Sequence, residues 1–397
     1  MLRKTRLFTP GPTPLLPAAQ QAMAFYDMHH RTADFRALLT RTLSDLKEFI
    51  GTQNDVLILA SSGTGAMEAS VSNLTSPGDK VLVLTAGKFG ERWTGLAKAY
   101  GCAAEVLSAP YGETFSLEDV KAKIAGAKVV YMQGTETSTG ARHDVQGIAK
   151  LVRAEADCLL VVDAITGLGT THFDVDGWGV DFIIGGSQKA LMIPPGLAYC
   201  SVSERAWQRM ETAKNPRFYF DLRKERKSQT KGETAFTPAT TLVAGMGAAL
   251  AHIRQMGSGD LVAGRKALID SAEMSAKLTR VAATALGLKL FAPTCPSGAV
   301  TAIVSPAGVD SSALVKDFRE TFGAVVANGQ GEMKGKLLRV AHLGYYDYLD
   351  VVACAAGLEQ VLSRAGVNVA FGSSVKAVQE AYASKTAGAR ELAGVKA

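Results

Sequence analysis

Two side chains of opposite charge follow apolar segments that are short enough to be buried strands. Lys189 follows the segment Asp181-Phe-Ile-Ile-Gly, and Asp163 ends the segment Leu159-Leu-Val-Val. Burial depresses the pKa of a lysine, and a neutral amine can attack an aldehyde to form an imine. A buried carboxylate needs a cationic or hydrogen-bonding partner. These residues indicate either structural groups, such as a paired lysine and a helix-capping aspartate, or a catalytic site.

A catalytic site would use both residues on one ligand. Asp163 and Lys189 are 26 residues apart, which leaves room for one helical crossover and the next strand. A heteroaromatic aldehyde between them would have its ring nitrogen at Asp163 and its carbonyl at Lys189. No histidine or second acid stands near Asp163 at ligand spacing, so we expect no metal.

A glycine-rich loop, Ala60-Ser-Ser-Gly-Thr-Gly-Ala-Met-Glu68, follows a predicted strand and begins a helix. Ser62, Gly63 and Thr64 could bind a phosphate through their hydroxyl and backbone donors at the positive end of that helix. The loop matches neither G-x-x-x-x-G-K-[ST] nor a full G-x-G-x-x-G, so a simple tight turn is the alternative.

The elements that would position these residues are seven continuous apolar segments with helix-like segments between most of them. Continuous rather than alternating hydrophobicity is typical of strands covered on both faces, so we predict an α/β domain with about seven mostly parallel strands. The predicted strands are Val56–Ala60, Val81–Leu84, Ala104–Leu107, Lys128–Met132, Leu159–Asp163, Asp181–Gly185 and Leu197–Val202. Ligands in such sheets bind beyond the carboxyl ends of the strands, where the candidate residues lie.

The rest of the chain predicts a second, smaller α+β domain. We expect a proline-rich N-terminal arm over residues 1–17, a large domain over 18–257, a small domain over 258–385 and a tail over 386–397. The basic segment 216–232 reads as a long loop with a solvated surface. In the small domain, Ala299–Ser305 and Lys336–Leu343 read as strands, and Leu349–Ala365 and Val375–Ala383 as helices.

Composition restricts the function class. The 397 residues are 47% hydrophobic and 20% charged, which excludes disorder, collagen-like repeats and coiled coil for the whole chain. The net charge of +6 is mild and suits anionic small molecules better than nucleic acid. Five cysteines without a C-x-x-C pair predict reduced thiols. No apolar segment approaches the ~18 residues of a membrane span or forms a secretory leader, so we expect a cytoplasmic enzyme without membrane contact.

The set of motifs, in this order and spacing, resembles a class V aminotransferase of fold type I, near the alanine–glyoxylate and serine–glyoxylate (serine–pyruvate) aminotransferases. The resemblance spans nearly the whole chain. Its motifs are Pro10-Gly-Pro12, His30-Arg31, Ser62-Gly-Thr64 through Glu68, Glu136-Thr-Ser-Thr-Gly140, Asp163, Gly186-Ser-Gln-Lys189, Thr237-Pro238 and Arg339-Val-Ala-His-Leu-Gly344.

The resemblance implies a role for each motif in binding pyridoxal 5'-phosphate and a substrate carboxylate. It implies that Lys189 bonds to the cofactor and moves the substrate proton, and that Asp163 keeps the ring nitrogen protonated. The implied phosphate ligands are Ser62, Gly63, Thr64 and Gln188, with Thr234 and Thr237 of the neighbouring subunit of a homodimer. Phe89 would stack on the ring, and Thr137, or Ser138 in its place, would bond beside the imine. Arg339, helped by the Gly11 backbone, would bind the substrate α-carboxylate.

The implied reaction is a ping-pong transfer of an amino group from alanine or serine to a 2-oxo acid, glyoxylate or pyruvate. The same fold also serves lyases and cysteine desulfurases, so the fold alone leaves the reaction open. Desulfurases usually place a histidine before the lysine, where this chain has Gln188, and Cys295 is the one loop-like nucleophile candidate. Three further alternatives remain. The substrate could be an unusual amine such as an aminophosphonate, or a dicarboxylate bound by Arg31 or Arg142. The protein could also be an idle cofactor-binding subunit.

Overall fold

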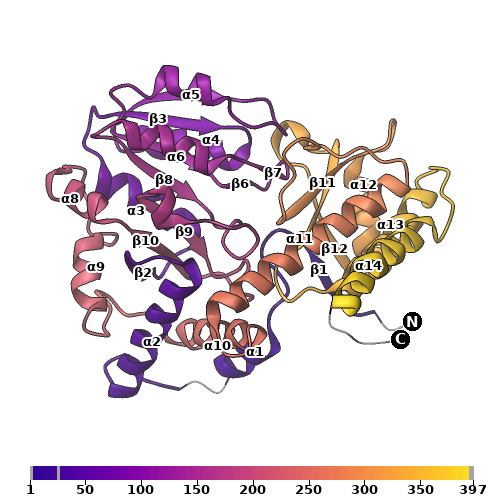
Figure 1. Ribbon diagram of the computed structural model, residues 1–397, viewed down its shortest axis with the longest axis horizontal. Coiled ribbons are helices and arrows are strands. Elements are labelled where there is room, and N and C mark those ends of the chain that lie inside the picture. The colour runs from indigo at the N-terminus through magenta and orange to yellow at the C-terminus, as the bar shows by residue number, and fades with distance from the viewer. Residues whose placement is uncertain (1–2, 25–26, 393–397) are drawn as a thin grey trace.

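The structure is a computed structural model that describes residues 3–24 and 27–392, with side chains as far as Ser384. A larger domain is built on a seven-stranded sheet and a smaller domain on a four-stranded sheet, and the long helix α11 (Leu261–Ala285) runs between them (Figure 1). The helices and strands are thus arranged around these two separate sheets.

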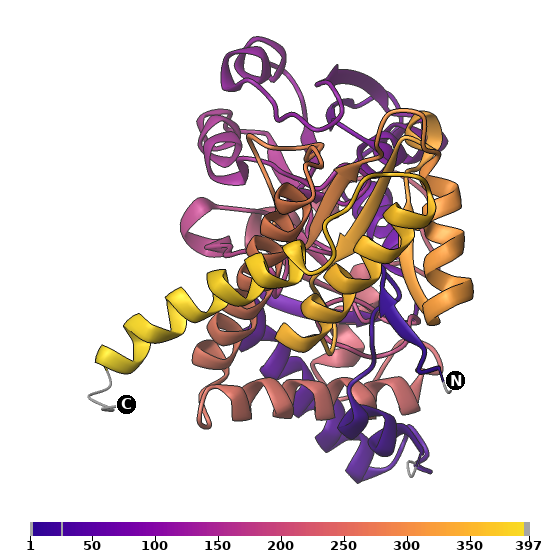
Figure 2. The same cartoon turned by 90° about the vertical axis from the view of Figure 1, so that its right-hand side faces the viewer.

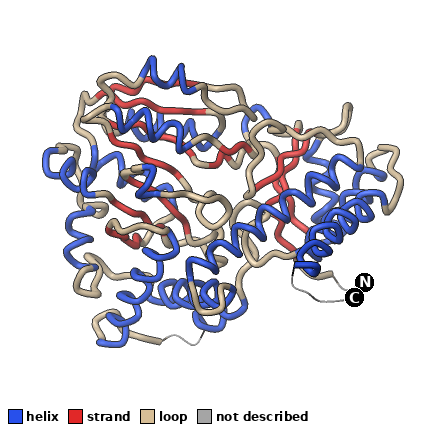
Figure 3. Tube along the Cα trace, in the orientation of Figure 1, coloured by secondary structure: helices blue, strands red, loops and turns tan. Residues whose placement is uncertain are grey.

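The large sheet contains all seven of the strands predicted from continuous apolar segments (Figure 3). In spatial order it is β2 (Asp55–Leu59), β10 (Ala198–Val202), β9 (Phe182–Gly186), β8 (Leu159–Asp163), β5 (Val129–Gln133), β3 (Lys80–Thr85) and β4 (Ala103–Ser108). The pairs from β9 through β4 are parallel, whereas β10 is antiparallel to both of its neighbours. The predicted α/β class with a mostly parallel sheet is confirmed.

Both faces of this sheet are buried, which explains why its strands are apolar without alternation. Within β5, Val130 and Met132 belong to one hydrophobic core, and Val129 and Tyr131 belong to the other. The first core includes residues of α2 and α6, and the second includes residues of α3, α4 and α8. The sheet is thus the middle of three layers, and only its strand ends are left to form a site.

The large-domain helices are α1 (Pro17–Ala24), α2 (Ala33–Ile50), α3 (Gly63–Leu74), α4 (Lys88–Ala99), α5 (Leu117–Lys123), α6 (Val145–Ala154), α7 (Val175–Trp178), α8 (Glu204–Thr212), α9 (Leu222–Gln229) and α10 (Thr240–Met256). Helices α3 to α7 connect successive strands of the large sheet, whereas α1 and α2 precede its first strand and α8 to α10 follow its last one. A two-stranded hairpin, β6 (Thr135–Glu136) with β7 (Ala141–Arg142), follows β5 at the carboxyl edge of the sheet.

The small domain includes the beginning of the chain. Its sheet has the order β1 (Arg6–Phe8), β12 (Ala324–Asn328), β13 (Leu337–Ala341) and β11 (Val300–Val304), with β1 parallel to β12. The helices α12 (Ser311–Phe322), α13 (Tyr348–Arg364) and α14 (Ser373–Leu392) complete it, with the short 3₁₀ turn η1 (Gly331–Met333). The predicted arm over residues 1–17 therefore includes a strand of this sheet, and β1 and β12 were missed from the sequence.

Two further expectations need correction. The segment predicted as a long loop contains helix α9, whose buried face carries Glu225 and Gln229 beside Leu222. Helix α14 continues to Leu392 and extends away from the domain body (Figure 2), so residues 386–392 of the predicted tail are helical. Residues 393–397 of that tail lie outside the described residues. In the described part of the chain, no helix combines the length and apolar character needed to span a membrane.

Candidate active site

A pocket with about 450 Å³ of empty volume lies beyond the carboxyl ends of β8 and β9. It brings together most of the residues predicted from the sequence. Its lining consists of Ser62, Gly63, Thr64, Phe89, Arg92, Thr135, Thr137, Asp163, Ile165, Thr166, Gln188 and Lys189. The location agrees with the rule that ligands of α/β sheets bind beyond the carboxyl strand ends.

Lys189 stands three residues after the end of β9 and lines the pocket with its side chain. Burial, against the opposing charge of Asp163 and together with the charges of Arg339 and Arg92, lowers the pKa of Lys189 to about 8. Its ammonium donates to the carbonyl oxygen of Pro10. A lysine with this pKa has a substantial neutral fraction at mildly alkaline pH, as a nucleophile or a base requires.

Asp163 is the last residue of β8 and is buried on the pocket floor. One carboxylate oxygen accepts a hydrogen bond from the Ile165 backbone N–H at 2.9 Å. Burial raises the pKa of Asp163 to about 6, whereas the Ile165 hydrogen bond and the charges of Arg92 and Lys189 oppose the shift. Asp163 is therefore an anion at neutral pH, and a cation placed against it would be strongly favoured.

The glycine-rich loop forms the N-terminus of α3. Ser62 is the N-cap residue, but its hydroxyl makes no capping hydrogen bond and is left available to a ligand. The first amides of a helix have no acceptor within the helix, so Gly63 and Thr64 contribute backbone donors at its positive end. Gln188, which also lines the pocket, has a buried side-chain oxygen without a hydrogen-bond partner among the described residues.

Glu136 fixes the backbone that carries Phe89. Its carboxylate accepts hydrogen bonds from the backbone N–H groups of Phe89 at 3.1 Å and Gly90 at 2.9 Å, which are first-turn donors of α4. It also accepts from the backbone and hydroxyl of Ser138 at 3.0 and 2.6 Å. Burial raises the pKa of Glu136, and these hydrogen bonds oppose the shift. Phe89 is thereby held at the pocket wall.

Thr137 and Ser138 have different surroundings, which bears on the choice left open by the sequence. Thr137 lines the pocket, whereas Ser138 donates to Glu136 and accepts from the Lys88 backbone N–H at 3.1 Å. The Ser138 hydroxyl is therefore occupied by structural hydrogen bonds, and the geometry favours Thr137 as the ligand-facing hydroxyl.

Arg339 lies in β13 and reaches from the small domain to the large one. Its Nε and Nη2 donate to the Asn328 carbonyl oxygen at 3.0 and 2.7 Å, and Nη1 donates to the Thr137 carbonyl oxygen at 2.9 Å. A guanidinium has five N–H donors, so one N–H on each terminal nitrogen is left for a ligand. Burial lowers the pKa of Arg339 to about 10, against the opposing charge of Glu136, and the group remains a cation.

The N-terminal segment packs directly on Lys189. Gly11 has φ +152°, which strains any L side chain, and a Cβ at this position would lie 2.9 Å from Lys189 Cε and displace the end of that side chain. Thr13 donates a hydrogen bond shared between the carbonyl oxygens of Gln188 at 3.2 Å and Lys189 at 3.1 Å. The arm therefore contributes to the site of its own chain.

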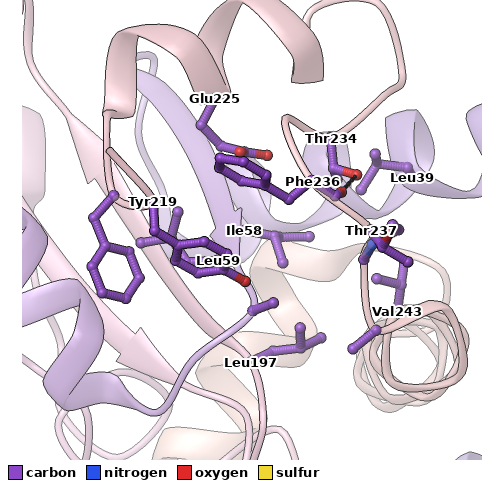
Figure 4. Close-up of a pocket in the computed structure, with 14 residues that line it drawn as sticks. Leu39, Ile58, Leu59, Leu197, Tyr219, Glu225, Thr234, Phe236, Thr237 and Val243 are labelled. Carbon is purple, nitrogen blue, oxygen red and sulfur yellow. Dashed lines mark hydrogen bonds between the residues drawn. The ribbon is translucent and has the colours of Figure 1, made fainter. Parts of the chain in front are cut away.

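Thr234 and Thr237 do not line the Lys189 pocket of their own chain. They lie in a separate pocket beside β2 with Tyr219, Phe236 and Glu225 (Figure 4). The rings of Tyr219 and Phe236 stack at 4.9 Å, and 47% of Tyr219 is exposed. This location is compatible with the expectation that these threonines serve a neighbouring subunit.

Four residues of the pocket lining were missed from the sequence: Arg92, Thr135, Ile165 and Thr166. Arg92 is three residues after Phe89 on α4, so the i, i+3 spacing could have indicated that both face the same site. Thr135 immediately precedes Glu136, and its hydroxyl is buried without a hydrogen-bond partner among the described residues. Nothing in the local sequence distinguishes that hydroxyl from an ordinary strand threonine.

These features fit pyridoxal 5'-phosphate. The unpartnered polar atoms of Thr135 and Gln188 are buried at the pocket wall, and the Ser62 hydroxyl is free of capping. An anion at the floor suits a protonated ring nitrogen, donors at a helix N-terminus suit a phosphate, and a lysine with a lowered pKa suits an aldehyde.

Comparison with known proteins identifies first the class and then the family. The fold superposes on the aspartate aminotransferase of subgroup IV from Thermus thermophilus with a TM-score of 0.84 and 36% identity, covering 90% of this chain and 99% of that one. Residues 7–330 match the model of the aminotransferase class-V family. The chain belongs to the class V aminotransferases, an enzyme family that generally depends on pyridoxal phosphate, uses amino and keto acids and is typically dimeric.

Two proteins with similar sequences carry very different names. The chain is 38% identical over 384 residues to a protein named soluble hydrogenase, small subunit, from a Synechococcus species, covering 95% of this chain and 98% of that protein. It is 32% identical over 402 residues to the L-aspartate–glyoxylate aminotransferase of Paracoccus denitrificans, covering 99% and 100%.

Proposed function

We propose that this enzyme transfers an amino group from a small amino acid, alanine or serine, to a 2-oxo acid such as glyoxylate or pyruvate, with pyridoxal 5'-phosphate bound at Lys189. The observation that carries the proposal is the meeting of three groups. Lys189 with a lowered pKa and the buried Asp163 line one pocket, and the charge of Arg339 acts on Lys189. A ping-pong order follows because donor and acceptor both present an α-carboxylate to the same arginine.

Lys189 has two tasks in this mechanism, and both need its lowered pKa. As a neutral amine it would hold the cofactor aldehyde, and as a base it would remove the Cα proton of the donor in the first half-reaction. In the second half-reaction its protonated form would give a proton to the Cα of the acceptor. A general base is most effective when its pKa is near the working pH. The Pro10 carbonyl accepts a hydrogen bond from the amine and restricts its position.

When bound, the cofactor supplies an aldehyde for the amine and a protonated ring that accepts the electron pair left at Cα. Asp163 holds the proton on the ring nitrogen, since an anion with a pKa of about 6 is ionised at neutral pH and favours a cation beside it. The hydroxyls of Thr135 and Thr137 and the ring of Phe89 orient the ring within the pocket.

Arg339 binds the carboxylate that every amino and keto acid substrate carries. Its hydrogen bonds to Asn328 and Thr137 fix the plane of the guanidinium before substrate arrives. The two remaining N–H groups, one on each terminal nitrogen, fit a bidentate carboxylate.

A desulfurase reaction is less well supported, because the chain offers no suitable sulfur nucleophile near Lys189. Cys295 lines a different pocket with Arg142 and His143, and its thiol donates to the Gly112 carbonyl oxygen at 3.4 Å. Burial raises the pKa of Cys295, which disfavours a thiolate.

Aspartate is a second candidate donor. The Thermus and Paracoccus relatives are both named for aspartate. An aspartate donor would need a cation for its second carboxylate, in addition to Arg339.

The proposal is tested by separate half-reactions. Purified enzyme is mixed with L-alanine, L-serine, L-aspartate or an aminophosphonate, and the visible absorbance of the bound cofactor is followed. Loss of absorbance with alanine or serine, and its recovery with glyoxylate or pyruvate, supports the proposed reaction. Bleaching by aspartate alone would replace the donor. Absorbance that no amine changes would contradict transamination and favour an idle subunit.

The proposed homodimer places Thr234 and Thr237 of each subunit at the cofactor phosphate of the other. Mixing Lys189→Ala subunits with Thr237→Ala subunits tests the sharing. In a mixed dimer one site carries both substitutions and the other carries neither, so about half of the dimers regain one active site. Two inactive parents that stay inactive after exchange would contradict shared sites.

A further inference from the structure

We propose that Arg92 supplies the positive charge that neutralises the cofactor phosphate and so links phosphate binding to the ring-stacking residue Phe89; this inference rests on the proposed function. Arg92 lies in the second turn of α4 and lines the pocket. None of the sequence motifs assigned a role to it.

Arg92 contacts both groups that the inference connects. Its Nη1 donates to the Thr64 hydroxyl at 2.9 Å, and Thr64 belongs to the glycine-rich loop at the N-terminus of α3. Its guanidinium carbon lies 5.2 Å from the centroid of the Phe89 ring, within the range of a cation–π contact. One side chain thus touches the phosphate loop and the ring wall.

The charge balance of the pocket requires such a group. The predicted phosphate ligands, Ser62, Gly63, Thr64, Gln188, Thr234 and Thr237, are all neutral, whereas a phosphate monoester carries a charge of about −1.5 to −2 at neutral pH. Lys189 is committed to the aldehyde, and Asp163 adds a further negative charge. Among the described residues that line the pocket, Arg92 is the one cationic residue besides Lys189.

Arg92 is also free to accept an anion. Among the described side chains it forms no ion pair, and its hydrogen bond goes to a neutral hydroxyl. An arginine presents five donors in a fixed fork, so one N–H can hold Thr64 while others bind phosphate oxygens. The cation–π contact limits the positions of the guanidinium and orients it before the phosphate arrives.

The test measures cofactor affinity in the apoprotein, independently of turnover. Dissociation constants are determined for pyridoxal 5'-phosphate and for pyridoxal, which lacks the phosphate, with wild type, Arg92→Gln and Arg92→Lys. We expect Arg92→Gln to weaken pyridoxal phosphate binding on the order of tenfold, at the low end for a charge-assisted hydrogen bond because Arg92 is exposed. Pyridoxal binding should change by less than about twofold, and Arg92→Lys should restore part of the loss.

Salt dependence and a control variant complete the test. Wild-type affinity for pyridoxal phosphate should fall more steeply with ionic strength than that of Arg92→Gln. Arg319→Gln removes an arginine whose side chain is 64% exposed in the small domain, and it should change neither affinity. Equal losses for both ligands, or no loss, would overturn the role of Arg92. Failure of wild type to bind pyridoxal phosphate would instead overturn the proposed function.

Discussion

Lys189 should react with an amine-selective reagent at a pH where an ordinary lysine is almost fully protonated. The apoprotein is treated with a trace of acetic anhydride at a series of pH values. Acetic anhydride acetylates only neutral amines. The neutral fraction of Lys189 therefore sets its rate of labelling.

The structure gives the size of the effect. With a pKa of about 8, roughly one Lys189 amine in ten is neutral at pH 7, compared with roughly one in 3,000 for a lysine with the ordinary pKa of 10.5. The advantage is about 300-fold at pH 7 and should level off above pH 9, where the amine of Lys189 is already neutral.

Peptide mass spectrometry measures the acetylated fraction of each lysine in one digest. Lys266, whose side chain is 76% exposed, serves as the internal reference for reagent reactivity. The two charges that act on Lys189 predict opposite shifts of its midpoint. Asp163→Asn removes an anion and should lower the pKa of Lys189, whereas Arg339→Ala removes a cation and should raise it.

Labelling of Lys189 that keeps increasing beyond pH 10 would refute the reasoning, because burial would then not have lowered its pKa. Shifts of the same sign in both variants would also refute it, since they would indicate a general structural change. Far-UV and near-UV circular dichroism of each variant separates that outcome from a local electrostatic effect.

Three further substitutions have defined outcomes. Arg339→Lys keeps a charge but loses the fork, so kcat/KM for amino acids should fall by about ten- to hundredfold, while reaction with an amine that lacks the α-carboxylate should be unchanged. Asp163→Asn should still bind the cofactor but slow exchange of the substrate Cα proton by at least about a hundredfold. Gly11→Ala should displace the Lys189 side chain, since the new Cβ would overlap it. Acetylation of Lys189 should therefore decrease, whereas the denaturation midpoint of the protein should change little.

The large sheet could be predicted because its strands are buried on both faces and carry continuous apolar residues. Strand β1 could not be predicted in this way, because it has only three residues and pairs with Ala324–Val326, which are distant in the sequence. No local pattern encodes a pairing between the two ends of a chain.

Helix α9 was missed because the side it buries is largely polar. The side-chain amide of Gln229 pairs with both the N–H and the carbonyl oxygen of Ile58, at 3.0 and 2.6 Å, on the edge strand β2. The helix thereby satisfies backbone groups of the sheet edge, a role that leaves no apolar periodicity in its sequence. Hydrophobic pattern alone therefore predicted a loop.

The candidate site was predictable where a residue directly follows a strand, as Asp163 and Lys189 do. It was not predictable where a residue acts through a neighbour. Glu136 matters because its carboxylate accepts hydrogen bonds from two backbone N–H groups of α4. Arg92 matters because it donates a hydrogen bond to Thr64, which lies on a different helix. These relations depend on how helices pack, which the spacing of one segment does not contain.

The pairing of β1 with β12 has a consequence for how the chain is made. Arg6 is synthesised 318 residues before its partner Ala324, which corresponds to roughly 15–60 s at typical rates of translation. During that interval the large domain can fold, because its strands lie between residues 55 and 202, while β1 remains an unpaired edge. The segment that leads to Lys189 is therefore anchored to the small-domain sheet only after all strands of the large sheet have been made.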